Sequence, residues 1–251
     1  MKRDLQNKTA LVTGASRGLG AAIAESLAAS GAGVAINFLS RAEDAEKVRK
    51  RILDRGGTAE AFQADVTDEG QVTGLCRSVV KRLGEVDILV LNATLIHVHK
   101  PIEELTWTDM LDHFRFFAKS PLLLAQQVLP SMKKKKYGRI IHIGSEVFER
   151  GIPGFSNYVA AKGAQLGLTR SWANELGPFG ITVNLVAPGW IPTEMHANDP
   201  VDFKQDYAHR VPLGHMGQPE DIGEMVAFLA SDAAKFITGQ RFTVNGGNTM
   251  P

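Results

Sequence analysis

The sequence predicts an α/β protein in which helices cover both faces of one parallel sheet, a doubly wound arrangement. Short β-branched runs alternate along the chain with longer amphipathic stretches. The short runs are largely apolar, which is typical of strands that are buried on both faces of a parallel sheet. The 251 residues contain no linker, repeat or low-complexity segment, so we expect one domain over residues 1–251.

The predicted strands are short runs rich in apolar and β-branched residues. They cover residues 9–13, 34–38, 59–63, 86–91, 139–143, 181–186 and 241–244. The stretches between these runs predict helices, because apolar residues recur there at helical spacing. The helices cover residues 18–30, 41–55, 68–82, 103–134, 157–176 and 219–231. This alternation favours parallel pairing, since each helix carries the chain back to the same end of the sheet.

Residues 190–217 break the alternation. The segment mixes Pro, His, Asp and Gly and has weak periodicity. We expect it to lie over the carboxyl edge of the sheet, where doubly wound folds bind their ligands. It is therefore the predicted substrate-loop region within the single domain.

Charge and hydropathy exclude two classes of partner. The net charge of +1 gives no global field for nucleic acid or for an acidic membrane surface. The lysines at 133–136 end a predicted helix, where they complement the helix dipole, so they do not indicate a nucleic-acid site. The chain has no apolar run long enough to span a bilayer, and its polar start lacks the apolar core of a signal peptide.

The cysteine and histidine content gives no sign of a disulfide or a metal site. Cys76 is the only cysteine, so no internal disulfide can form, which fits a reducing compartment. His97 and His99 follow the fourth predicted strand, but no Cys, His or Asp cluster with metal-ligand spacing accompanies them. We expect a cytoplasmic protein without a bound metal.

A glycine-rich turn, Thr13-Gly14-Ala15-Ser16-Arg17-Gly18-Leu19-Gly20, lies between the first predicted strand and the first predicted helix. Glycines let the backbone approach a pyrophosphate closely, and the helix N-terminus offers free N–H groups. The spacing is Gly-x-x-x-Gly-x-Gly rather than the commoner Gly-x-Gly-x-x-Gly, and short glycine motifs also occur in turns without a ligand. The location after the first strand of an alternating chain favours a dinucleotide.

Tyr158 and Lys162 lie four residues apart, with Ser145 thirteen residues upstream of the tyrosine. Residues four apart share one face of a helix. An ammonium beside a phenol favours the phenolate, which predicts an easier proton donor near neutral pH. A serine hydroxyl nearby could hold a carbonyl oxygen against the phenol. The three side chains would provide an acid for reducing a ketone, or a base for oxidising an alcohol.

The order and spacing of these motifs resemble those of the short-chain dehydrogenase/reductase family. The resemblance rests on Thr13 to Gly20, Asp65-Val66, Asn92-Ala93, Ser145, Tyr158 to Lys162, Asn184, Pro188-Gly189 and Gly246-Gly247. Within the family, the chain looks most like the 3-oxoacyl-[acyl-carrier-protein] reductase group. The resemblance implies a seven-stranded Rossmann fold, an oxidoreductase acting on a small-molecule or carrier-linked carbonyl substrate, and a homotetramer.

The resemblance also implies the roles of individual residues. Ser145, Tyr158 and Lys162 would be catalytic, and the last two would also contact the cofactor. The other cofactor-binding positions would be Gly14, Ser16, Arg17, Gly18, Leu19, Gly20, Ser40, Arg41, Asp65, Val66, Asn92, Ala93, Pro188, Gly189, Ile191 and Thr193. Of these, Asp65 and Val66 would hold the adenine, and the residues from 188 to 193 would touch the nicotinamide carboxamide.

The end of the second predicted strand favours NADP(H) over NAD(H). NAD enzymes hold the adenosine ribose there with a carboxylate, which repels a 2′-phosphate. Here Phe38 occupies that position. Arg17 and Arg41 could pair with a 2′-phosphate, and Ser40 could donate to it. Arg41 could equally be an ordinary residue at the start of a charged helix.

The chain departs from the family pattern in the helix predicted over 103–134. Phe117 stands where family members usually carry an asparagine that helps to hold a water beside the lysine. Thr94 also replaces a glycine near the expected cofactor site. Two alternatives to an NADP(H)-dependent ketoreductase therefore remain open. They are an NAD-linked alcohol dehydrogenase and a weakly catalytic dinucleotide-binding sensor.

Overall fold

The computed structural model describes residues 4–97, 99–196 and 200–250. Its centre is a parallel sheet with the strand order β3-β2-β1-β4-β5-β6-β7. The strands are β1 (Thr9–Val12), β2 (Gly33–Phe38), β3 (Thr58–Gln63), β4 (Ile88–Leu91), β5 (Gly138–Ile143), β6 (Ile181–Pro188) and β7 (Arg241–Val244). This sheet confirms the predicted fold class. The predicted strand positions agree with the observed ones to within two residues.

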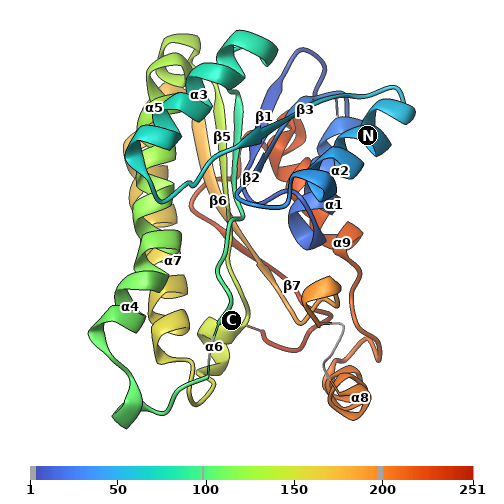
Figure 1. Cartoon of the computed structure of the whole chain (residues 1–251), viewed down its shortest axis with the longest axis vertical. Coiled ribbons are helices and arrows are strands. Elements are labelled where there is room, and N and C mark those ends of the chain that lie inside the picture. Colours follow the sequence, from blue (N-terminus) through green and yellow to red (C-terminus); the bar gives the residue numbers. More distant parts are fainter. Residues whose placement is uncertain (1–3, 98, 197–199, 251) are drawn as a thin grey trace.

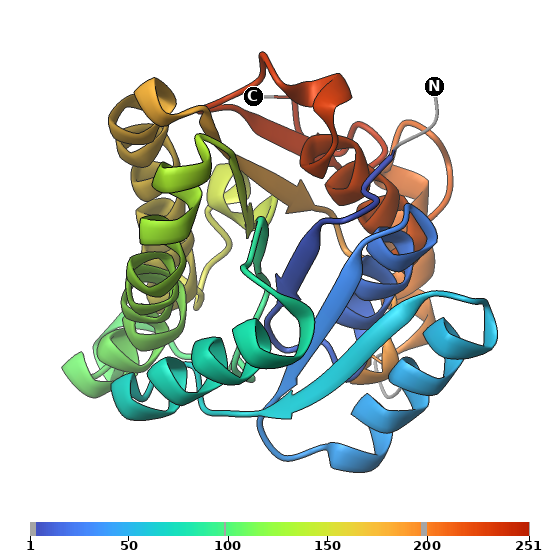
Figure 2. The same ribbon diagram turned by 90° about the horizontal axis from the view of Figure 1, so that it is seen from above.

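Helices cover both faces of the sheet (Figure 2). One layer holds α1 (Gly18–Ala29), α2 (Ala42–Asp54) and α9 (Pro219–Ala230). The other layer holds α3 (Glu69–Leu83), α4 (Trp107–Phe114), α5 (Ser120–Lys135) and α7 (Ser156–Leu176). Successive side chains of a strand point to opposite faces. In β1, Ala10 and Val12 therefore join the core beneath α1 and α9, whereas Leu11 joins the core beneath α3 and α5.

Side-chain caps fix where two of these helices begin. The Asp68 carboxylate accepts from the Gln71 N–H at 2.8 Å and caps α3. Thr106 and Asp109 form a reciprocal capping box at the start of α4. Each cap satisfies N–H groups that have no partner within the first turn of a helix.

The helix predicted over 103–134 is divided. A π-helical turn, Arg115–Lys119, separates α4 from α5, and the short 3₁₀ turn Ile102–Glu104 precedes α4. A π-helical turn inserts an extra residue and changes the direction in which the neighbouring side chains point. Phe117 lies in the middle of this turn, fully buried.

Two short helices at the carboxyl edge of the sheet were not predicted. They are α6 (Val147–Arg150), which follows β5, and α8 (Val201–Arg210), which lies within the segment 190–217. Figure 1 shows both at the lower end of the molecule, beyond the ends of β5 and β7. The expected position of the segment 190–217 over this edge agrees with the location of α8.

The strand order reverses between β1 and β4. The chain runs outward from β1 through β2 to β3, and then returns to place β4 on the other side of β1. The connections after β1 and β4 therefore diverge and leave a crevice outside the carboxyl ends of these two strands. The glycine turn follows β1, and Asn92 follows β4, so both lie at this switch point.

Candidate active site

The carboxyl end of β5 and the first turns of α7 bring Ser145, Tyr158 and Lys162 together. Ser145 follows β5 by two residues, and the other two lie on α7. The Ser145 hydroxyl lies near the Tyr158 phenol and favours its ionised form, which lowers its pKa. Lys162 Nζ donates to the Ile143 carbonyl at 2.8 Å, which ties α7 to the end of β5. The sequence motif is thus a spatial group at the edge where the fold binds ligands.

Burial governs the acidity of the Tyr158 phenol and the Lys162 ammonium. It raises the pKa of Tyr158 to about 12, and the Ser145 hydroxyl offsets part of that rise. It lowers the pKa of Lys162 to about 7. The sequence predicted that the neighbouring ammonium makes the phenol more acidic. This prediction is wrong, because burial raises the pKa of the phenol instead. A low-dielectric surrounding favours the neutral form of both groups.

Four aromatic rings surround the Tyr158 ring. Their centroids lie 5.6 Å (His97), 6.1 Å (His113), 5.6 Å (Phe117) and 6.3 Å (Phe155) from its own. The sequence indicated Phe117 as a departure from the family pattern and His97 as a residue that follows the fourth predicted strand, but His113 and Phe155 were missed. A signal for His113 was present, because it lies four residues before Phe117 and so shares its side of the helix.

The two histidines beside Tyr158 are hydrogen-bonded to each other. His97 Nδ1 lies 3.3 Å from His113 Nε2, and His113 Nδ1 lies 3.0 Å from the Asp109 carbonyl oxygen. Since a carbonyl only accepts, His113 Nδ1 carries the proton, and His97 Nδ1 donates to His113 Nε2. Burial, together with the neighbouring His113, lowers the pKa of His97. The lowered pKa favours the neutral form of His97 beside the phenol.

The glycine turn after β1 has the backbone shape that close approach of a ligand requires. Gly14 has φ +61°, and a Cβ there would lie 2.9 Å from Ala93 Cα. A Cβ on Gly20 would lie 2.4 Å from the Gly14 carbonyl oxygen. Ser16 and Leu19 lie in the same turn and are half-buried. Only glycine fits these two positions, so the turn stays open above the N-terminus of α1.

Asn92 fastens the glycine turn to the end of β4. Its side-chain amide donates to the carbonyl oxygens of Thr13 and Gly14 at 2.9 and 3.1 Å. The N–H groups of Asn92 and Ala93 both donate to Thr13 Oγ1, at 2.9 and 3.0 Å. These bonds hold both sides of the switch point in a fixed arrangement. Thr94, which follows, is exposed, and its hydroxyl donates to the Leu95 carbonyl.

The end of β2 carries the residues expected near a 2′-phosphate. Phe38 is buried, and Ser40 and Arg41 after it are exposed. Arg41 is the N-cap residue of α2, and its guanidinium lies 3.4 Å from the Asp44 carboxylate. Arg17 is the N-cap residue of α1 and is half-buried. The two guanidinium groups thus belong to the first turns of neighbouring helices.

The end of β3 places Asp65 and Val66 on the same edge. Asp65 Oδ1 accepts from the N–H and the hydroxyl of Thr67, at 2.8 and 2.7 Å. The Asp65 N–H in turn donates to Gln71 Oε1 at 2.9 Å. Val66 is buried. The carboxylate therefore holds its own turn in place.

The loop after β6 lies against the glycine turn. Pro188 ends β6, and the Gly189 N–H donates to the Val244 carbonyl at 3.0 Å. A Cβ on Gly18 would lie 3.4 Å from Thr193 Cγ2, so these two residues face each other. Ile191, which lies between Gly189 and Thr193 in the sequence, is buried. The fold thus brings Thr193 close to the start of α1, while Pro188, Gly189 and Ile191 lie in the same loop at the end of β6.

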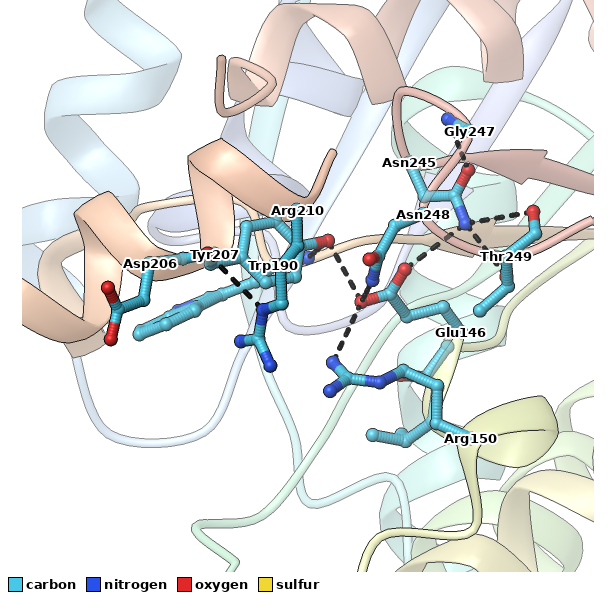
Figure 3. A network of polar contacts seen from close by, with 12 residues as sticks. Glu146, Arg150, Trp190, Asp206, Tyr207, Arg210, Asn245, Gly247, Asn248 and Thr249 are labelled. Carbon is cyan, nitrogen blue, oxygen red and sulfur yellow. Dashed lines mark hydrogen bonds and ion pairs between the residues drawn. The ribbon is translucent and has the colours of Figure 1, made fainter. Parts of the chain in front are cut away.

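A buried carboxylate immediately after Ser145 connects several parts of this edge (Figure 3). Glu146 is 3% exposed. Its Oε1 accepts from the Tyr207 hydroxyl at 2.8 Å and from the Asn248 amide at 2.9 Å, and its Oε2 accepts from the Asn245 amide at 3.1 Å. Arg150 NH1 lies 3.5 Å from Oε1. Sequence reasoning gave no sign of this network, because its members are far apart in the chain.

The same network reaches the loop after β6. The Tyr207 hydroxyl accepts from the Trp190 N–H at 2.8 Å while it donates to Glu146. Tyr207 lies on α8, and Trp190 follows Gly189. The carboxylate thereby holds α8, the loop after β6 and the C-terminal segment against the residue that follows Ser145.

We expect a Glu146→Leu variant to lower the melting temperature by about 6–12 °C. The substitution leaves the Tyr207 hydroxyl and the half-buried Asn248 amide without their acceptor and removes one acceptor of the buried Asn245 amide, at about 3 kcal/mol in total. A protein of this size loses roughly 2–4 °C per kcal/mol. Thermal unfolding measures the effect, and Glu175→Leu, on the exposed side of α7, is the control. Equal melting temperatures for the two variants would contradict the role of the network.

In the described residues, no helix is both long and apolar enough to cross a membrane. A search of the same parts of the chain finds no group of three or more His, Cys, Asp or Glu side chains able to hold a metal ion. The lysine run ends α5 as predicted, with Lys136 in a left-handed conformation. Lys135 from this run pairs with Asp87 at 2.8 Å, so part of its charge is neutralised within the fold.

Comparison with known proteins agrees with this geometry. The family model described as enoyl-(acyl carrier protein) reductase matches residues 14–249. The 3-oxoacyl-[acyl-carrier-protein] reductase FabG of Staphylococcus aureus is 42% identical over 245 residues, which are 97% of this chain and 98% of that protein.

Two solved structures cover nearly the whole chain. A short-chain dehydrogenase/reductase from Serratia marcescens is 37% identical, covers 98% of this chain and 99% of its own, and has a TM-score of 0.90. A blue fluorescent protein from a metagenomic library, in complex with NADPH, is 38% identical, covers 98% of this chain and 100% of its own, and also has a TM-score of 0.90. The chain therefore belongs to the short-chain dehydrogenase/reductase family, as the resemblance of its motifs implied, and it is an oxidoreductase of the FabG-like ketoreductase type.

Proposed function

We propose that this chain reduces a ketone with NADPH, or oxidises the matching secondary alcohol with NADP⁺, through Ser145, Tyr158 and Lys162. The observation that carries the proposal is the grouping of these side chains at the end of β5. There the Ser145 hydroxyl lies near the phenol, and Lys162 Nζ donates to the Ile143 carbonyl. The site lies on the same sheet edge as the glycine turn, so a dinucleotide and a carbonyl could be held next to each other.

Each catalytic side chain has a defined task in this proposal. Bound NADPH supplies the hydride that reduces the carbonyl carbon. Ser145 orients the carbonyl oxygen, and the Tyr158 O–H protonates the alkoxide as it develops. The ammonium of Lys162 stabilises the phenolate that remains. The raised pKa of Tyr158 keeps the phenol protonated before the reaction, which is the form that reduction needs.

The shape of the crevice fits a dinucleotide. The glycine positions at 14, 18 and 20, with Ser16 and Leu19, would receive the pyrophosphate above the N-terminus of α1. Asp65, Val66, Asn92 and Ala93 would border the adenosine side, and the loop from 188 to 193 would border the nicotinamide side. NADP(H) is favoured because Phe38, Arg17, Ser40 and Arg41 supply two guanidiniums and no carboxylate. The NADPH complex of the related blue fluorescent protein supports the same choice.

The substrate class is proposed from the relatives. The FabG proteins are named as reductases of 3-oxoacyl groups on acyl carrier protein, so we propose a 3-oxoacyl-type ketone, on a carrier or as a smaller analogue. We further propose that the chain acts as one domain, in the cytoplasm, as a homotetramer. Helices α4, α5 and α7 offer the outer surface that the family resemblance assigns to subunit contacts.

Turnover assays and cofactor titrations test the proposal together. We expect NADPH to be oxidised when a 3-oxoacyl thioester is supplied, and NADPH to bind at least tenfold more tightly than NADH. Tight NADPH binding without turnover on a panel of ketones would favour the dinucleotide sensor. Tighter binding of NADH would favour the NAD-linked alcohol dehydrogenase.

An Arg41→Ala variant is expected to weaken NADPH binding by about tenfold and to leave NADH binding within twofold. A charge-assisted hydrogen bond between a guanidinium and a phosphate contributes about 1.5–3 kcal/mol. Calorimetric titration with both cofactors measures the change. Arg49→Ala is the control, because Arg49 also lies on α2 and pairs with Glu46 three residues away, as Arg41 does with Asp44. An equal loss of affinity for both cofactors would contradict the assignment.

A further inference from the structure

The ammonium of Lys162 is held by three neighbours inside the protein. The residue is 5% exposed. Its Nζ donates to the Ile143 carbonyl at 2.8 Å and to Gln165 Oε1 at 3.1 Å. The same atom lies 3.9 Å from the centre of the Phe117 ring, within the range of a cation–π interaction. A buried ammonium is tolerated only where such contacts replace water.

Gln165 is a buried polar side chain on the same face of α7 as Lys162. It is 1% exposed and lies one turn after Lys162 on α7. The side chain of Thr169, a further turn along, bonds only to the Gln165 backbone carbonyl, at 2.8 Å. The Gln165 amide oxygen, by contrast, points at the ammonium. An unpaired amide group in a protein core is unfavourable. The hydrogen bond to Lys162 therefore explains why a glutamine is buried at position 165.

Phe117 approaches the same ammonium from the opposite helix. The π-helical turn Arg115–Lys119 directs its ring toward α7, where it packs edge-on against Tyr158 with the centroids 5.6 Å apart. A phenyl ring offers its face to a cation but cannot accept a conventional hydrogen bond from it. The polar acceptor that the family resemblance places at position 117 is thus absent, and an acceptor is present at position 165 instead.

We propose that Gln165 is a positioning residue that, together with the face of Phe117, holds the Lys162 ammonium in place of the asparagine expected at position 117. The inference rests on the proposed function, because it assigns Gln165 a part in the proton transfer through Tyr158 and Lys162. Gln165 acts through Lys162 and needs no contact with the substrate.

The other titratable groups around Lys162 do not compete for this role. They are Tyr158 on α7, His142 on β5 and His113 on α4, the last through its contacts with Tyr158 and Phe117. His142 is fully buried, and neither of its ring nitrogens has a hydrogen-bond partner. Burial and the charge of Lys162 lower its pKa to about 3, so it stays neutral and adds no second cation. No carboxylate pairs with Lys162 in the described residues, which leaves Gln165 as its side-chain acceptor.

Two substitutions of Gln165 with opposite electrostatic effects test the inference. Gln165→Leu removes the acceptor at similar volume, and we expect kcat for ketone reduction to fall by about ten- to a hundredfold with NADPH affinity unchanged. The Gln165→Leu substitution also disfavours the charged form of Lys162. The pH above which kcat declines should therefore move down by about one unit. Gln165→Glu keeps an acceptor and adds a negative charge, so the same pH limit should move up. A merely structural role would lower the rates without these opposite shifts.

Restoring the family arrangement provides a second test. In the Gln165→Leu background, Phe117→Asn introduces an acceptor from the other helix and is expected to recover at least a tenth of the wild-type kcat. Thr169→Val is the matched control, because it removes a buried hydroxyl from the same helix stripe without touching Lys162. Thermal unfolding of every variant separates a loss of stability from a loss of rate.

The outcomes are distinguishable. A wild-type rate and pH limit in Gln165→Leu would overturn the inference while leaving the proposed function intact. A wild-type protein that reduces no ketone would overturn the proposed function itself. If Gln165→Leu does not fold, the pH limit of Gln165→Glu decides the question, and an unchanged or lower limit there would overturn the inference.

Discussion

A Tyr158→Phe variant is expected to lose ketone reduction by about a thousandfold while binding NADPH as tightly as the wild type. General acid catalysis contributes about 10²–10⁴ in rate, and phenylalanine has no proton to give. The rest of the site should persist, because the phenyl ring keeps the packing against His97, His113, Phe117 and Phe155. Steady-state kinetics and a fluorescence titration with NADPH measure the two quantities.

Tyr137→Phe is the control for this substitution. Tyr137 lies just before β5, away from the carboxyl edge, with Lys8 Nζ 3.7 Å from the centre of its ring. We expect wild-type rates from this variant. A Tyr158→Phe protein that kept most of its activity would exclude the phenol as the acid and would leave the grouping at the end of β5 without its proposed function.

A Lys162→Met variant is expected to be inactive, and its stability should depend on pH differently from that of the wild type. In the folded protein the pKa of Lys162 is lowered to about 7 by burial, whereas an unfolded lysine titrates near 10.5. Below pH 7 both states carry the proton, so the wild type bears the whole penalty of a buried charge. Between about pH 7 and 10.5 the unfolded state binds more protons than the folded state, so wild-type stability rises with pH.

The measurement is the difference in melting temperature between the variant and the wild type from pH 6 to pH 9. We expect any advantage of the variant to be largest at pH 6 and to shrink by about 3 kcal/mol, or roughly 6–12 °C, by pH 9. Lys81→Met, which removes an exposed ammonium from α3, is the control and should show no such trend. A difference that stays constant with pH would show that the Lys162 ammonium is not destabilised in the folded state.

Local sequence was enough to predict the sheet, most helices and the position of the site. The apolar runs mark buried strands because side-chain period and burial are properties of each segment. The glycine turn and the spacing of Tyr158 and Lys162 are likewise short-range features, since a turn or a helix of one segment brings their residues together. The order of strands and helices then places both features on the carboxyl edge, because all parallel strands end there.

Contacts between distant segments decided the rest. The Glu146 network joins residues up to 102 positions apart, and no periodicity in the sequence marks it. The pKa of Tyr158 is shifted in the direction opposite to the sequence prediction, because burial depends on every element packed around the phenol. The sequence by itself determined the fold class and predicted that Ser145, Tyr158 and Lys162 act as a group. Only the tertiary structure showed that Gln165 and Phe117 contact the Lys162 ammonium. The contact with Phe117 requires α7 to pack against the π-helical turn.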